Sequence, residues 1–155
     1  MFRQEIWQDL KGIGGVPLYL VVTLLALTFD KVTLFVQLVI GLILAFAVTA
    51  IIRFVYFKER PIKQEYRTMI ERIDASSFPS LHTGRAAVLG TLLILHVQNL
   101  WGGVIIGLAA LGVAAARVSL KRHFVWDVIF GLLIGVVIGF AAVQITALLP
   151  LSKIL

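Results

Sequence analysis

Long apolar stretches alternate with short polar ones along most of the chain. Five hydrophobic segments of helical length run over roughly 13–29, 32–57, 81–98, 100–120 and 124–149. Because an α-helix rises about 1.5 Å per residue, crossing a hydrocarbon core about 30 Å thick takes about 20 apolar residues. The second and fifth segments exceed that length, and the first and third are marginal. We therefore predict an all-α integral membrane protein with a bundle of about five transmembrane helices.

Two further stretches have the pattern of helices that lie in the membrane interface. In residues 2–10, apolar side chains recur at four-residue spacing between charged and polar ones, which is typical of a short amphipathic helix. The polar connector over residues 58–80 contains a second such pattern, and we predict an interfacial helix over residues 61–74. A solvated linker is the alternative interpretation of this connector, because residues 75–77 have the composition of a loop.

The loops between the hydrophobic segments divide into two sides. Short loops at residues 30–31 and 98–99 predict tight antiparallel neighbours on one side, whereas the connector and the turn at Lys121 and Arg122 fall on the other. That second side collects twelve of the fourteen basic residues: Arg3, Lys11, Arg53, Lys58, Arg60, Lys63, Arg67, Arg72, Arg85, Arg117, Lys121 and Arg122. By the positive-inside rule, the charged side is expected to be cytoplasmic.

Composition agrees with a membrane environment. The chain is 60% hydrophobic and only 14% charged, with a mean hydropathy of +1.01, so it falls among membrane proteins, and we expect one membrane domain over residues 1–155. The chain has no cysteine, which excludes disulfides and thiolate-bound metal. A net charge of +6 in such a chain indicates topology and anionic headgroups, and no stretch is typical of a nucleic-acid-binding module.

Small residues recur at four-residue spacing in the last two segments. They are Gly103, Gly107, Ala110 and Ala114 in the fourth segment and Gly131, Gly135 and Gly139 in the fifth. Such spacing is typical of close helix packing in membranes. We therefore predict that these two helices pack tightly on each other, which would fix Arg117 relative to His123.

Ionisable side chains gather in three clusters at segment ends on the charged side. The clusters are Arg53 with Arg60, Ser80 with His82, and Arg117 with His123 and Asp127. Charged groups near a membrane core are costly and usually face a cavity or a partner, so each is a candidate functional residue. Guanidinium groups bind phosphate oxygens with paired hydrogen bonds, and three of them can neutralise the oxygens of a phosphoryl transition state.

The histidines divide into a nucleophile and an acid. His123 and Asp127 are four residues apart, which on a helix puts both side chains on one face. We expect the Asp127 carboxylate to hydrogen-bond the ring nitrogen of His123 that faces away from the phosphate and so fix the tautomer. His123 is then the predicted nucleophile, and His82 the general acid. Ser80 is expected at a helix N-cap, with the N–H groups of residues 81–83 turned to the anion.

The spacing of these residues resembles the three signature motifs of the type 2 phosphatidic acid phosphatase superfamily. The motifs read Arg53, six residues, Arg60-Pro61; then Pro79-Ser80-Leu81-His82; then Arg117, five residues, His123, three residues, Asp127. The resemblance implies metal-independent dephosphorylation of a membrane lipid phosphate or pyrophosphate through a phosphohistidine at His123, with no cofactor. The implied phosphate ligands are Arg53, Arg60, Ser80, Leu81 and Arg117. Polyprenyl pyrophosphate, phosphatidic acid and phosphatidylglycerol phosphate are all substrates of the implied class.

Three positions depart from the family pattern. Arg53 stands where the family usually has Lys, Leu81 where it has Gly, and Ala116 where it has Ser. None of these changes alters the two histidines or the aspartate of the motifs, so catalysis is still expected. The resemblance also implies a multi-pass protein of the cell membrane. Relatives commonly have six spans, and many bacterial ones place the site outside the cytoplasm, contrary to the charge rule.

Two other functions and several simpler roles stay open. The same basic pocket fits a non-catalytic lipid-phosphate binder or transporter, and it also fits a lipid phosphotransferase. Lys58, Arg72 and Arg85 are interpreted as snorkelling anchors at helix ends. His96 lies about 21 Å beyond His82 along one predicted helix. It therefore belongs to the opposite interface, and we assign it no chemistry.

Overall fold

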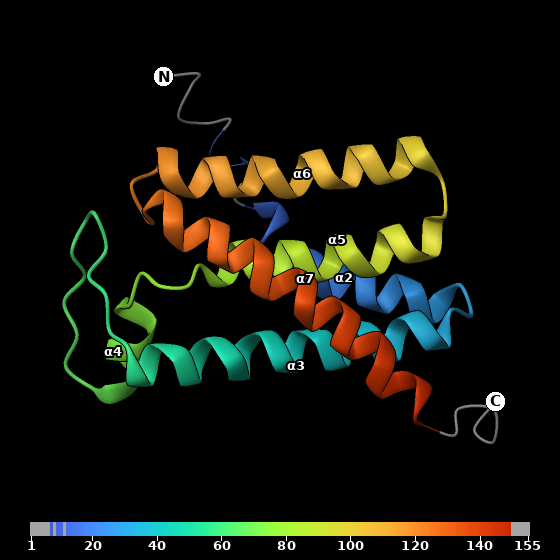
Figure 1. Cartoon of the computed structure of the whole chain (residues 1–155), viewed down its shortest axis with the longest axis horizontal. Helices are drawn as coiled ribbons and strands as arrows, with labels where there is room; N and C mark the ends of the chain where they lie inside the picture. Colours follow the sequence, from blue (N-terminus) through green and yellow to red (C-terminus); the bar gives the residue numbers. More distant parts are fainter. Residues whose placement is uncertain (1–6, 8, 11, 150–155) are drawn as a thin grey trace.

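The computed structural model describes residues 7, 9, 10 and 12–149, and the regular structure of this part of the chain is all helical (Figure 1). The helices are α2 (Val16–Thr28), α3 (Val32–Val55), α4 (Met69–Ala75), α5 (Leu81–Val97), α6 (Leu100–Ser119) and α7 (Val125–Ala147). All of them except α4 match the five predicted hydrophobic segments to within three residues at each end. The sequence pattern therefore predicted these helices correctly.

Three of the helices, α3, α6 and α7, are long and apolar enough to cross a membrane, and α2 and α5 are shorter apolar helices. Large apolar side chains remain exposed along the outer faces of the bundle, among them Ile51, Leu108 and Val137. A soluble protein rarely exposes so much contiguous apolar surface. The chain is a multi-pass membrane protein built as a helical bundle.

Helix α5 lies at the centre of the bundle and packs against α3, α6 and α7 (Figure 1). Its side chains Val88 and Leu92 are fully buried in a cluster with Leu38 of α3 and Tyr19 of α2. The Tyr19 hydroxyl donates to the Leu38 carbonyl at 2.9 Å, which satisfies the polar end of a buried aromatic ring. The core therefore holds α2 and α3 against the central helix.

The glycines of α7 pack against α5. A Cβ added at Gly135 would collide with the backbone oxygen of Gly84 and the side chain of Ala87, and one at Gly139 would lie 2.8 Å from Thr91 Cβ. The prediction that the fourth and fifth hydrophobic segments pack tightly on each other is therefore wrong, since α6 touches α7 far less than α5 does. Small-residue spacing marks the packing face of a helix, but it does not say which helix lies against that face.

The chain connections that carry the predicted site lie at one end of the bundle. Figure 1 places the connector between α3 and α5 at the same end as the turn between α6 and α7. The short loops that join α2 to α3 and α5 to α6 lie at the opposite end. The predicted division of the loops between two sides is thus confirmed for the described part of the chain.

The connector is less helical than predicted. A helix over residues 61–74 is wrong for residues 61–68, because α4 begins only at Met69. Thr68 is the N-cap: its hydroxyl accepts from Glu71 N at 3.2 Å, and the Glu71 carboxylate accepts from Thr68 N at 3.2 Å. This capping box fixes the helix start, and the apolar spacing before it belongs to an irregular loop.

The predicted interfacial helix over residues 2–10 falls largely outside the described part of the chain. Residues 7, 9, 10, 12 and 13 are helical. The side chain of Leu10 lies 3.5 Å from where a Cβ would stand on Gly112, so this segment contacts α6.

Candidate active site

The predicted site residues converge from four helices. Arg53 lies in the last turn of α3 and Arg117 in the last turn of α6. Ser80 is the N-cap of α5, and Asp127 lies in the first turn of α7. His123 lies in the loop just before α7. All five side chains are buried, so the chain has placed ionisable groups where water does not solvate them freely.

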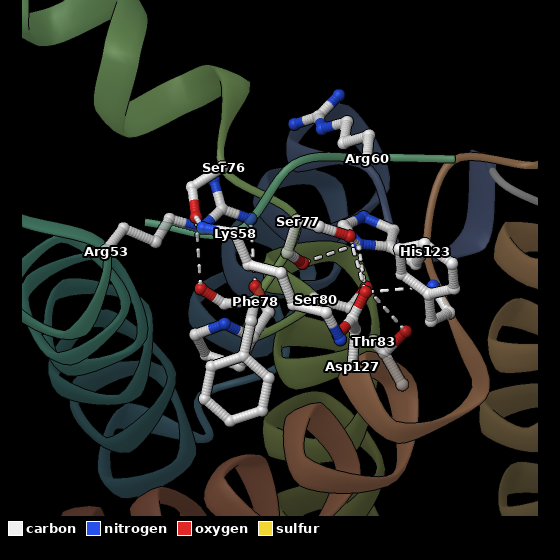
Figure 2. A network of polar contacts seen from close by, with 12 residues as sticks. Arg53, Lys58, Arg60, Ser76, Ser77, Phe78, Ser80, Thr83, His123 and Asp127 are labelled. Atoms are coloured by element: carbon white, nitrogen blue, oxygen red, sulfur yellow. Dashed lines mark hydrogen bonds and ion pairs between the residues drawn. The ribbon is translucent and has the colours of Figure 1, made fainter. Parts of the chain in front are cut away.

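The imidazole of His123 is held by a backbone carbonyl. Its Nδ1 lies 2.7 Å from the Ser77 carbonyl oxygen and 3.5 Å from the Ser77 hydroxyl (Figure 2). A carbonyl oxygen only accepts hydrogen bonds, so Nδ1 carries the proton and Nε2 keeps its lone pair. That is the tautomer a nucleophilic histidine needs.

The predicted hydrogen bond between Asp127 and His123 is absent. Asp127 Oδ2 lies 4.0 Å from His123 Nδ1, which is too far for a hydrogen bond. The prediction assumed that both residues are on one helix, but Phe124 is the N-cap of α7. His123 therefore precedes the helix, and the four-residue spacing places the two side chains near each other without pairing them.

The Asp127 carboxylate is instead occupied by three other donors. Its Oδ1 accepts from Lys58 Nζ at 2.6 Å. Its Oδ2 accepts from Phe124 N at 2.8 Å and from the Ser77 hydroxyl. Figure 2 shows these contacts meeting at the carboxylate. A fully buried carboxylate needs such compensation, because leaving it unpaired would cost several kcal/mol.

The three motif arginines keep unused donors. The Nε atoms of Arg53, Arg60 and Arg117 are buried and have no hydrogen-bond partner within the described residues. Such orphaned donors are rare in folded proteins and point to an acceptor that the protein itself does not supply. An anion with several oxygens fits that description.

Two of these arginines also hold the connector. Arg53 donates to the carbonyls of Pro79 at 2.9 Å and Ile73 at 3.3 Å, and Arg60 donates to the carbonyl of Asp74 at 2.5 Å. These bonds fix the end of α4 and the entry to α5 against the end of α3. Arg117 has no such structural bond among the described residues, so its guanidinium is the least committed of the three.

The N-terminus of α5 faces the same region. Ser80 donates its backbone N–H to the Asp127 carbonyl at 2.9 Å, and its hydroxyl pairs with that of Thr83 at 2.9 Å. The first hydrogen bond of the helix runs from the Gly84 N–H to the Ser80 carbonyl, at 2.9 Å. The N–H groups of residues 81–83 therefore have no acceptor within the helix. Leu81 packs part of its side chain on the core, and its backbone N–H is the group that can donate to an anion.

His82 lies near the nucleophile candidate. His123 and Arg117 are both close enough to act on the charge of its imidazole. The other histidine of α5, His96, lies in the last turn, where its Nδ1 is 2.9 Å from the Leu92 carbonyl. His96 is therefore at the other end of α5, as predicted.

The environment of His123 favours the neutral ring. Burial is the main cause that lowers the pKa of His123 from 6.5 to about 3. The charges of Arg117 and Arg60 act in the same direction, against a smaller opposing effect of the Ser77 carbonyl. An imidazole with so low a pKa is neutral throughout the physiological pH range, with one proton on the ring.

Sequence reasoning missed Lys58 and Ser77. The interpretation of Lys58 as a snorkelling anchor is wrong, because its Nζ is bound to Asp127. Its position inside the six-residue spacer of the first motif, together with a buried carboxylate in need of a cation, was the available signal. No local pattern distinguishes Ser77, because its partners His123 and Asp127 lie 46 and 50 residues away.

Arg85 is also not an anchor. It is buried in α5, and its Nε and one terminal nitrogen donate to the Gly14 carbonyl at 3.2 and 2.9 Å. Arg85 therefore ties the chain that precedes α2 to the central helix. Arg72 stacks on the Phe57 ring at 5.0 Å, a contact that neither supports nor contradicts the anchor interpretation.

Three features meet at one end of this membrane bundle: a neutral buried imidazole, three arginines with unused donors, and a helix N-terminus with free N–H groups. This combination is typical of the class of membrane proteins that bind an oxyanion. No group of three or more His, Cys, Asp or Glu side chains within residues 7, 9, 10 and 12–149 is placed to hold a metal ion.

The chain belongs to the PAP2 superfamily, whose family model matches residues 34–149. A curated relative is the undecaprenyl-diphosphatase BcrC of Bacillus subtilis (strain 168), 29% identical over 111 residues, which are 70% of this chain. The match covers 54% of that relative, so the chain spans about half its length.

Two solved structures share the fold. The LpxE of Aquifex aeolicus superposes with a TM-score of 0.77 at 21% identity, covering 92% of this chain and 86% of the other. A PAP2-type phosphatidylglycerolphosphate phosphatase of Bacillus subtilis superposes with a TM-score of 0.66 at 20% identity, covering 94% of this chain and 77% of the other.

Proposed function

We propose that this chain is an integral-membrane lipid phosphate phosphatase that works without a metal ion or other cofactor, through a phosphohistidine at His123. The observation that carries the proposal is the pairing of two features. His123 presents a lone pair on Nε2 because Ser77 holds its other nitrogen. Arg53, Arg60 and Arg117 are close enough for their charges to act on His123, and the Nε atom of each has no hydrogen-bond partner among the described residues.

In the first step, the Nε2 lone pair of His123 forms a bond to phosphorus while the bond from phosphorus to the leaving oxygen breaks. His82 donates its proton to that oxygen. The arginines and the N–H groups at the start of α5 stabilise the negative charge that builds on the remaining oxygens. In the second step, water attacks phosphorus, His82 takes a proton from the water, and the bond to His123 breaks. The enzyme returns to its starting state.

Five helices, α2, α3, α5, α6 and α7, are proposed to cross the cell membrane as a single domain. The site then lies at headgroup depth, where the phosphate of a lipid lies. The charge rule favours a cytoplasmic site, whereas analogy with bacterial relatives favours the other face. Labelling a single cysteine at position 65 (Glu65→Cys) in intact cells, in this otherwise cysteine-free chain, decides between the two.

An apolar cavity supports a lipid substrate. It has a volume of about 190 Å³ and lies between α2, α5 and α6, with Ala86 and Leu93 of α5 and Ala110 of α6 in its lining. Ala86 and Leu93 are four and eleven residues after His82, so they continue the helix face that carries the proposed acid. A cavity on this face can hold part of the hydrocarbon tail of a lipid.

The substrate class is a lipid phosphate or diphosphate. The name of the Bacillus subtilis relative BcrC indicates undecaprenyl diphosphate, and the name of the structural relative from the same organism indicates phosphatidylglycerol phosphate. Both belong in a test panel, together with phosphatidic acid.

The test is phosphate release from this panel by the purified protein in detergent, with and without EDTA. We expect the protein to hydrolyse at least one of these lipids at a rate that EDTA does not lower. The His123→Ala variant should lose at least about a thousandfold in kcat. The matched control is His96→Ala, which removes the same side chain at the far end of α5 and should keep full activity.

Other results would contradict one part of this proposal or favour a different function. Loss of activity in EDTA contradicts the metal-free mechanism, and full activity in His123→Ala contradicts the nucleophile. Lipid binding without turnover on every substrate favours a binder or transporter. Product that forms only when a lipid acceptor is added favours a phosphotransferase.

A further inference from the structure

A lysine outside the motif positions reaches into the site. Lys58 lies in the connector three residues after α3, and its Nζ is 2.6 Å from Asp127 Oδ1. The Lys58 side chain is 28% exposed, whereas Asp127 is fully buried. The ammonium therefore meets a carboxylate that has no access to water, and it does so from the rim of the site.

The rest of Lys58 is also fixed. Its carbonyl accepts from Ser77 N at 2.7 Å, and its N–H donates to the Ser76 hydroxyl at 3.2 Å. Its ammonium lies 4.7 Å from the centre of the Phe124 ring, a favourable cation–π distance. Lys58 thus bonds through its backbone to one end of the connector and through its side chain to the start of α7.

These contacts control the two groups that face His123 Nδ1. One is the Ser77 carbonyl, 2.7 Å away, and the other is the Asp127 carboxylate, 4.0 Å away. The backbone bond from Ser77 to Lys58 holds the first group in place. The ion pair offsets the charge of the second, which would otherwise attract a proton onto the ring.

We propose that Lys58 is a positioning residue for His123: its ammonium occupies the Asp127 carboxylate, which also binds the Ser77 hydroxyl, so that the Ser77 carbonyl stays on Nδ1 and Nε2 stays unprotonated and aimed at the phosphate. This inference rests on the proposed function, in which His123 attacks phosphorus. Lys58 acts through Ser77 and Asp127, and it touches neither the substrate nor the reacting atoms.

The titratable and charged groups near His123 come from several elements. Among the described residues they are Arg53 of α3, Lys58 and Arg60 of the connector, His82 of α5, Arg117 of α6, Arg122 of the turn before α7 and Asp127 of α7. Asp127 is the only anion in this set. Removing the ammonium of Lys58 leaves that anion without its ion-pair partner beside the imidazole, which favours protonation of His123.

The test compares Lys58→Met, Lys58→Arg and wild type on a lipid phosphate that the wild type hydrolyses. In Lys58→Met we expect kcat to fall at least about tenfold while KM changes by less than about threefold. The acid limb of kcat/KM should move up by about one pH unit or more, because an opposite charge a few ångströms away raises a histidine pKa. Lys58→Arg keeps the positive charge and should restore both values.

The matched control is Lys63→Met. Lys63 is a lysine of the same connector whose side chain is 77% exposed and paired with Glu59 at 2.9 Å. It should behave as wild type. A structural defect in Lys58→Met would lower activity without moving the acid limb, so the pH profile separates positioning from stability. A higher KM with unchanged kcat would overturn the proposal, because Lys58 would then be a substrate ligand.

A second readout does not depend on turnover. The chain has three histidines, so the NMR spectrum of protein with isotope-labelled histidine contains few signals. The signal that disappears in His123→Ala is that of His123. The pH titration of that signal should shift upward in Lys58→Met and return in Lys58→Arg. An unchanged titration overturns the positioning role. A shifted titration in a protein that hydrolyses no lipid keeps the positioning role and overturns the proposed function.

Discussion

The neutral imidazole of His123 ties stability to pH. In the folded chain the pKa of this histidine is lowered to about 3 by burial and by nearby arginines, whereas in the unfolded chain it is near 6.5. The unfolded state therefore binds more protons between these two values. The contribution of His123 to stability is fully present above about pH 6.5 and is lost as the pH falls toward about 3.

We accordingly expect the midpoint temperature of thermal unfolding in detergent to decrease when the pH is lowered from 7 to 4.5. His123→Asn removes the titrating group and should reduce this fall, which differential scanning fluorimetry can measure at each pH. A fall of equal size in wild type and variant would mean that other groups cause it.

A second prediction follows from the Ser77 carbonyl. In hydrolases whose aspartate orients the catalytic histidine, replacing that aspartate by asparagine costs about 10⁴ in kcat, because the wrong tautomer results. Here the carbonyl sets the tautomer, so Asp127→Asn should cost less than about a hundredfold. A steady-state kcat measurement decides, and a loss near 10⁴ would show that Asp127 binds the imidazole during turnover.

At the scale of the helices, the α5–α7 contact depends on missing side chains. A Cβ on Gly135 would overlap the Gly84 carbonyl oxygen, so Gly135→Ala should destabilise the protein by about 1–3 kcal/mol through overpacking. Gly107 of α6 has nothing within 4 Å of its added Cβ, so Gly107→Ala is the matched control. Thermal unfolding in detergent should show a clear loss for the first variant and none for the second.

The helices themselves were predictable from the sequence because one physical rule dominates them. A segment that crosses a membrane must be apolar for about 20 residues and must satisfy its own backbone. The length of the apolar segments therefore predicted the long helices α3, α6 and α7, and also the shorter helices α2 and α5. The start of α4 depends on a Thr68–Glu71 capping box, a local signal that the apolar spacing obscured.

The site was only partly predictable from the sequence. Motif spacing placed Arg117, His123 and Asp127 at one end of the bundle, because helix ends are set by sequence. The bonds that orient His123 and Asp127 come from Lys58 and Ser77, which are distant in sequence. Such long-range pairs follow from how the connector folds back, and no periodicity in the chain encodes them.

At the scale of the whole molecule, the cavity between α2, α5 and α6 should select substrates by their tails. Ala110→Phe places a ring in this cavity and should lower kcat/KM on a long-chain lipid phosphate at least about tenfold. A short-chain, water-soluble phosphate should be hydrolysed as well as by wild type, because the phosphate site is untouched. Leu111→Phe, on an exposed position of α6, is the control.

The bond between Ser77 N and the Lys58 carbonyl, 2.7 Å long, has a practical consequence for anyone who wishes to track this protein. It closes the connector at its root, and the exposed stretch at residues 65–66 lies near the middle of the closed loop, away in sequence from both Arg60 and Ser77. Lengthening a loop that is already closed costs little, since each doubling adds only about 0.6 kcal/mol. An epitope or a fluorescent reporter spliced into this stretch would mark one face of the membrane and leave the chemistry intact.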